Sequence, residues 1–78
     1  MNRKLKTPAA LPAATERRRL REAAGLSGAS LAALVGVAPA TVYGWESGRE
    51  PRGLLRDAYA TVLKRLEEHA KATSAPDG

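Results

Sequence analysis

The sequence has no cysteine, no phenylalanine and only one histidine in its 78 residues. The absence of cysteine excludes a disulfide framework and a thiolate metal site. His69 alone cannot form a multi-histidine site, so we expect no metal and no cofactor. Because aromatic residues are few, alanine and leucine supply most of the apolar mass, a composition that favours helices over strands.

Long hydrophobic runs are lacking as well. The most apolar stretch, from Leu31 to Val42, is interrupted by Gly36 and Pro39 and is too short to span a bilayer. The basic start of the chain is broken by prolines before it reaches the apolar region of a secretion signal. We expect no membrane partner and a cytoplasmic protein.

The elements of a catalytic centre are missing too. The chain has no glycine-rich phosphate loop and no motif that joins a histidine to a serine or to a carboxylate pair. A single domain of this length encloses little space for a ligand pocket. We therefore expect neither an enzyme nor a small-molecule binder.

Positive charge is what the sequence has in excess. The net charge is +5 and the isoelectric point about 10.3. Residues 1–52 hold nine Arg or Lys against four Asp or Glu, whereas residues 53–78 hold four of each. This asymmetry favours a polyanionic partner, bound through release of counterions from phosphates. The alternative is that the charge serves solubility alone.

The pattern of glycine, proline and apolar residues predicts four helices. Residues 1–14 read as a flexible basic arm, and Thr15 is expected to cap a first helix that ends at Gly25. Its inward side is expected to hold Leu20, Ala23 and Ala24, while Arg17, Arg18 and Arg19 mostly cover the rest of its surface.

Ser27 is expected to cap a second, short helix that runs to about Val35, with Gly36 as a left-handed turn residue. Pro39 suits the first position of a third helix, which stops near Ser47 and Gly48. The inward residues are expected to be Leu31, Ala32, Leu34 or Val35 in the second helix and Val42 and Trp45 in the third.

A longer helix is predicted from Leu54 to about Ala70, after a loop that contains Pro51. The helical domain is thus expected to cover residues 15–70, followed by a disordered tail over 71–78. The apolar residues of this helix, spaced by four, three and four, could close the core or form a dimer seam: Leu55, Tyr59, Val62 and Leu66.

Two short helices joined by a glycine turn are the outline of a helix-turn-helix. Close packing of the two helices requires a small residue at Ala32, a positive φ at Gly36 and inward apolar residues at Val37 and Val42. The sequence resembles the Cro-and-phage-repressor class of this motif, also called Xre-like, over about half of the chain. The resemblance rests on four blocks: Leu20 to Ser27, Leu31-Ala32 with Gly36-Val37, Thr41 to Gly48, and Pro51.

The resemblance implies a compact all-α, lambda-repressor-like domain of a bacterial or phage transcription regulator, often a repressor and associated with the nucleoid. It implies that the third helix, about Pro39 to Ser47, enters the major groove of duplex DNA. It also implies a structural ion pair between Arg21 and Glu46, which would join the first helix to the third. Two solvated charges are the alternative interpretation of that pair.

The candidate DNA-binding residues fall into three groups. Those expected at base edges are Ala38, Pro39, Ala40, Thr41 and Gly44, with Tyr43 at a base edge or a phosphate. Those expected at the DNA backbone are Gly28, Ser47, Arg49, Arg52 and Arg18. The arm cations Arg3, Lys4 and Lys6 are expected to reach into a minor groove.

Two of these positions depart from the family pattern. Gly28 stands where a glutamine that donates to a phosphate is common, and Thr41 alone among the five base-edge positions has a hydrogen-bonding side chain. Three interpretations stay open: contacts of small side chains with thymine methyl groups, recognition of DNA shape, or a face that docks a protein. An antitoxin-like adaptor and a homodimer also remain alternatives.

Overall fold

The computed structural model describes the backbone of residues 10–74 and the side chains of residues 10–71. It contains α1 (Ala14–Ala23), α2 (Gly28–Val35), α3 (Pro39–Glu46) and α4 (Gly53–Ser74). There is no strand among residues 10–74, which confirms the expected all-α fold. The expected arm cations Arg3, Lys4 and Lys6, and residues 75–78 of the expected tail, lie outside the described residues.

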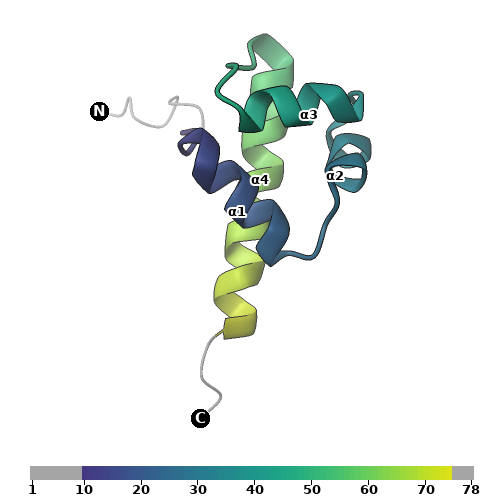
Figure 1. Ribbon diagram of the computed structural model, residues 1–78. Helices are drawn as coiled ribbons and strands as arrows, with labels where there is room; N and C mark the ends of the chain where they lie inside the picture. The colour runs from purple at the N-terminus through teal and green to yellow at the C-terminus, as the bar shows by residue number, and fades with distance from the viewer. Residues whose placement is uncertain (1–9, 75–78) are drawn as a thin grey trace, which may run out of the picture.

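The other three helices are arranged around the first half of the long α4 (Figure 1). Both α1 and α2 pack against α4, and both also contact α3, which lies across them. The second half of α4 runs past the other helices toward the C-terminal end of the chain. Among the described residues, no single helix is long and apolar enough to cross a membrane, although the bent pair of α2 and α3 has the length and composition when taken together.

Local sequence explains where the middle helices begin and end. The hydroxyl of Ser27 accepts the backbone N–H of Ser30 at 3.0 Å and so caps α2, as expected. Gly36 ends α2 with a φ of 94°, a conformation that costs glycine little. Pro39 then opens α3 at its first position, where a missing N–H leaves no hydrogen bond unmade.

The outer ends of the helical region differ from the expectation. Thr15 does not cap α1, because the carbonyl of Ala13 already accepts the N–H groups of Glu16 and Arg17 and starts the helix earlier. Residues 71–74, expected in the disordered tail, form the last turn of α4. No proline or glycine interrupts the chain between Gly53 and Pro76, so nothing local stops the helix sooner.

The core joins all four helices and is centred on Trp45 of α3 and Tyr59 of α4, whose ring centroids are 4.4 Å apart. Val42 and Trp45 are buried as expected, and Val35 rather than Leu34 packs inward from α2. The buried core residues are Leu20, Leu31, Ala32, Val42, Trp45, Tyr59 and Leu63.

Two expected apolar stripes are displaced. On α4 the most buried residues after Tyr59 are Ala60 and Leu63, whereas Leu55 is exposed and Val62 and Leu66 lie at the margin of the core. The stripe is rotated because α4 packs against α1 as well as α2. On α1, Ala23 is exposed and Ala24 half-buried, since Arg17 and Arg21 occupy the inward positions beside Leu20.

The hydroxyl of Tyr59 is buried and has no hydrogen-bond partner among the described residues. Burial, together with the negative charge of Glu46, raises the pKa of Tyr59 to about 12, while the charges of Arg17 and Arg21 act in the opposite direction. In the unfolded chain the same group ionises near pH 10. The folded domain therefore binds more protons than the unfolded chain between about pH 10 and pH 12, so stability is full below this interval and falls through it.

We expect Tyr59→Phe to remove this part of the alkaline destabilisation, an effect on the order of 2 kcal/mol for a shift of this size. The matched control is Tyr43→Phe, on the exposed second tyrosine. The measurement is the free energy of unfolding from urea titrations near pH 9 and near pH 11.5. An equal loss of stability in the two variants over this interval would count against the assignment to Tyr59.

Candidate nucleic-acid interface

The α2–α3 unit has the geometry of a helix-turn-helix. The chain bends by 106° between the two helices, within the range of this motif. Ala32, at the centre of α2, is almost fully buried, and Val37 packs against the core just after the turn. Because Val42 and Trp45 face the core, the opposite side of α3 faces solvent, where a partner can reach it.

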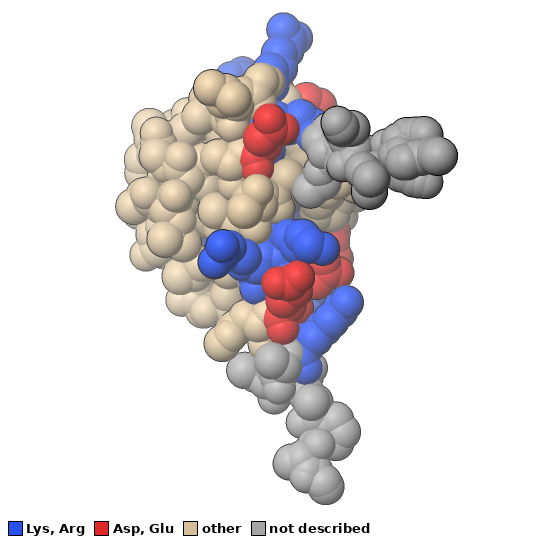
Figure 2. Space-filling model, turned by 180° about the vertical axis from the view of Figure 1, so that it is seen from behind, with Lys and Arg blue, Asp and Glu red and all other residues tan. Residues whose placement is uncertain are grey.

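The outer side of α3 has few functional groups. Of the expected base-edge residues, Ala38, Pro39 and Ala40 are exposed, whereas Thr41 and Gly44 are half-buried. No charged residue lies between Glu22 and Glu46. Figure 2, seen from behind, shows a broad uncharged surface on the left, the side on which α2 lies after this turn. Most of the hydrogen-bonding capacity of this interface therefore has to come from residues that border α3.

Tyr43 is the largest exposed residue of α3 and lies over Gly28. An ideal Cβ on Gly28 would be 2.4 Å from Tyr43 Cζ and 2.5 Å from its hydroxyl oxygen, so only glycine leaves room for the ring in this position. The guanidinium of Arg21 lies 5.9 Å from the ring centroid. Gly28, expected at a phosphate, is buried beneath Tyr43, because its missing side chain lets the tyrosine reach from α3 to the start of α2.

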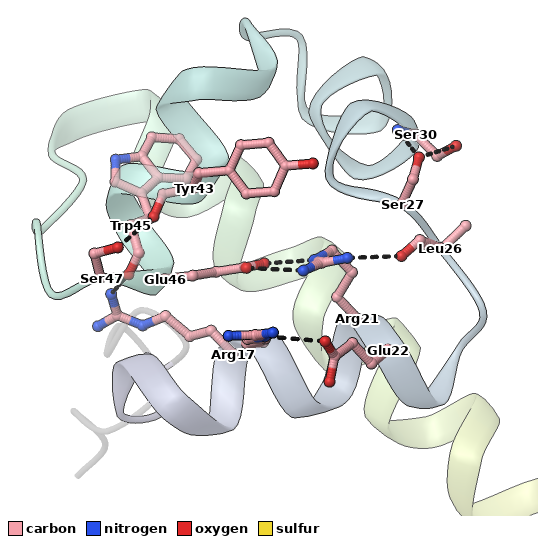
Figure 3. A network of polar contacts seen from close by, with 11 residues as sticks. Arg17, Arg21, Glu22, Leu26, Ser27, Ser30, Tyr43, Trp45, Glu46 and Ser47 are labelled. Atoms are coloured by element: carbon pink, nitrogen blue, oxygen red, sulfur yellow. Dashed lines mark hydrogen bonds and ion pairs between the residues drawn. The ribbon is translucent and has the colours of Figure 1, made fainter.

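Arg21 and Glu46 form the ion pair that the resemblance implies (Figure 3). Arg21 Nε donates to Glu46 Oε2 at 2.6 Å and Nη2 donates to Oε1 at 3.0 Å, while Nη1 donates to the carbonyl of Leu26. The two side chains are only 10% and 5% exposed. The hydrogen bond with Glu46 raises the pKa of Arg21, so the guanidinium stays charged despite burial. The pair joins α1 to the end of α3.

Arg17 makes a second buried connection that the sequence did not indicate, since it was expected on the surface with Arg18 and Arg19. Its side chain is 4% exposed and donates to the carbonyls of Pro12 at 2.7 Å and Trp45 at 3.0 Å. It also pairs with both oxygens of Glu50, a residue that is itself 64% exposed. The one available signal was spacing, because positions 17 and 21 are one helical turn apart and share a face.

The remaining cations near the site are on the surface. Arg18 pairs with Glu22, and Arg19 pairs with Glu16, so the charges on this side of α1 are partly balanced. Arg49 and Arg52 are exposed in the segment between α3 and α4, and Ser47 is exposed at the end of α3. The structure thus brings Ser47 and Arg49 to the end of α3 and leaves Arg18 engaged within α1.

We expect Arg17→Met to lower the free energy of unfolding by roughly 2–4 kcal/mol, because two backbone carbonyls lose a charged donor in a buried position. Arg18→Met is the matched control, an equal substitution at the next residue, where only an exposed ion pair is lost. Chemical denaturation of both variants makes the comparison. Similar decreases in the free energy of unfolding for the two variants would show that the buried contacts of Arg17 do not contribute to stability.

For the Arg21–Glu46 pair, we expect each single variant, Arg21→Met or Glu46→Leu, to be less stable than the double variant. A single replacement leaves one buried charge without a partner, which costs about 3–5 kcal/mol, whereas the double replacement leaves none. Urea unfolding of the four proteins of this cycle provides the test. A double variant that is as unstable as the sum of the singles would contradict the coupling.

The comparisons with known proteins agree with this geometry. The chain has no significant match among curated proteins and none among solved structures. A family model described as a helix-turn-helix domain matches residues 14–66, which include α1, α2, α3 and the first part of α4. The match covers well over half of the sequence and contains both buried arginines, Arg17 and Arg21. The protein therefore belongs to the helix-turn-helix domain family and has the fold with which this family binds DNA.

Proposed function

We propose that this protein is a transcription regulator of the Cro-and-phage-repressor, or Xre-like, type that inserts α3 into the major groove of duplex DNA. The observation that carries the proposal is the outer side of α3, which is exposed and built from small residues on a rigidly anchored helix. A helix without bulky side chains can approach the floor of the groove closely, and its alanines can contact thymine methyl groups.

The cations around α3 suit contacts with the DNA backbone. Arg52 is exposed just beyond the end of the helix, and Ser47 is exposed at the end of the helix itself. Contacts of this kind set affinity and register, and each one releases counterions from the DNA. The arm residues Arg3, Lys4 and Lys6 would add contacts in a neighbouring minor groove.

A second candidate function is docking of a protein on the same surface. It is favoured by the absence of charge between Glu22 and Glu46, together with the exposed side chains of Leu34 and Tyr43. A DNA-binding protein relies on the charges around this surface, whereas a docking module would rely on the uncharged surface itself. The two functions therefore differ in their dependence on salt.

Selection of bound sequences from a randomised duplex pool at two salt concentrations tests the proposal. We expect sequence enrichment and an affinity that falls steeply with salt, with a slope of roughly 0.9 per phosphate contacted. Arg52→Ala should weaken binding to all sequences and reduce the slope by about one.

The matched control is Arg65→Ala, which removes the same charge from the half of α4 that runs past α3 and should leave the slope unchanged. No binding to any duplex at low salt would contradict DNA binding and favour the docking module. Tyr43→Ala should then be tested for loss of the protein partner.

A further inference from the structure

The end of α3 determines where the next side chain lies. Gly48 has a φ of 114° and donates its N–H to the carbonyl of Trp45, while Arg49 donates its N–H to the carbonyl of Gly44 at 3.0 Å. These two hydrogen bonds define a Schellman motif, which turns the chain back along the helix. In this motif the second residue after the helix cap typically packs against the last turn, and here that residue is Arg49.

Because Gly44 has no side chain, the backbone of the last turn of α3 is not covered by a side chain at this position. An ideal Cβ on Gly44 would be 3.7 Å from Arg49 Cδ and 3.9 Å from Arg49 Nε. The side chain of Arg49 therefore lies beside the last turn of α3, within van der Waals distance of the place that a Cβ of residue 44 would take. A loop residue thus supplies a guanidinium to the outer side of a helix that has no charge of its own before Glu46.

The backbone that carries the side chain of Arg49 is held in place by the buried side chain of Arg17. Arg17 donates to the carbonyl of Trp45 at 3.0 Å and to that of Arg49 at 3.5 Å, and it binds the carboxylate of Glu50. Pro51, which follows, is buried. Arg17 engages the neighbouring carboxylate of Glu50. The guanidinium of Arg49 takes part in none of the ion pairs found among the described residues. Its donors are left for a partner.

We propose that Arg49 is the specificity-determining residue of this interface and donates a bidentate pair of hydrogen bonds to a guanine in the major groove. The inference rests on the proposed DNA binding and names the group that reads the sequence. Guanine presents two acceptors, N7 and O6, on its major-groove edge, and the planar guanidinium matches their spacing. The exposed side of α3 itself cannot make such a two-donor contact, since Thr41 and Tyr43 each have a single hydroxyl and the other residues there are alanine, proline and glycine.

The test is selection from a randomised duplex pool with the full chain and with Arg49→Ala. We expect the wild type to enrich guanine at one position, and Arg49→Ala to lose that preference while its preferences elsewhere persist. The expected loss of discrimination is roughly 5-fold to 140-fold, the ~1–3 kcal/mol of a bidentate pair. Arg52→Ala is the matched control: it should bind more weakly and enrich the same sequence as the wild type.

Gly44→Leu provides an independent variant that keeps Arg49. Leucine favours the helix more than glycine does, and because a Cβ at this half-buried position would already touch Arg49 Cδ, the rest of the leucine side chain is expected to displace the side chain of Arg49. We expect Gly44→Leu to lose the same guanine preference, and the double variant Gly44→Leu with Arg49→Ala to lose no more at that position. Independent, multiplying losses would contradict the contact across Gly44.

Two outcomes overturn the inference in distinguishable ways. If Arg49→Ala binds all sequences more weakly and still enriches the wild-type sequence, Arg49 contacts a phosphate and does not read a base. If the wild type enriches no sequence at either salt concentration, the proposed sequence-specific function fails, and the reading role of Arg49 fails with it.

Discussion

The fold depends on two buried guanidinium groups that α1 directs toward the end of α3. Arg17 and Arg21 are one helical turn apart, and each makes both a charged contact and a contact with a backbone carbonyl. A chain of 78 residues with few aromatics has a small apolar core, in which Trp45 and Tyr59 are the largest members. Buried guanidinium groups that each donate to several acceptors connect the helices where this small core does not, and they help to determine how the helices are oriented.

This anchoring explains why the outer side of α3 tolerates so simple a composition. Buried side chains on the inner side of α3 and the ion pair at its C-terminal end hold the helix in place. The residues on its solvent-exposed side are therefore not needed to position it. Two glycines lie next to larger side chains on this surface: Gly28 leaves the space that the ring of Tyr43 occupies, and Gly44 lies within contact distance of the side chain of Arg49. At each place, a larger side chain from another segment lies next to a glycine, which has no side chain of its own.

Much of the fold was predictable from the sequence because its determinants are local. Ser27 as a cap, Gly36 as a left-handed turn and Pro39 as a first helical residue act within a few residues, and the structure places all three as expected. The limits of α1 and α4 were less predictable. Ala13 shows no sequence signal as a cap, and the end of a helix without proline or glycine is weakly specified.

The sequence by itself determined the helical class, the charge asymmetry and the α2–α3 motif, since composition and short-range spacing are sufficient for these. Only the tertiary structure decided that Arg17 is buried while Arg18 and Arg19 are not, because burial depends on contacts with residues about thirty positions away. It also decided that Arg49 lies beside Gly44 and that Gly28 lies under Tyr43. Such contacts depend on how the helices are placed relative to one another, and the residue pattern within a single helix does not predict this placement.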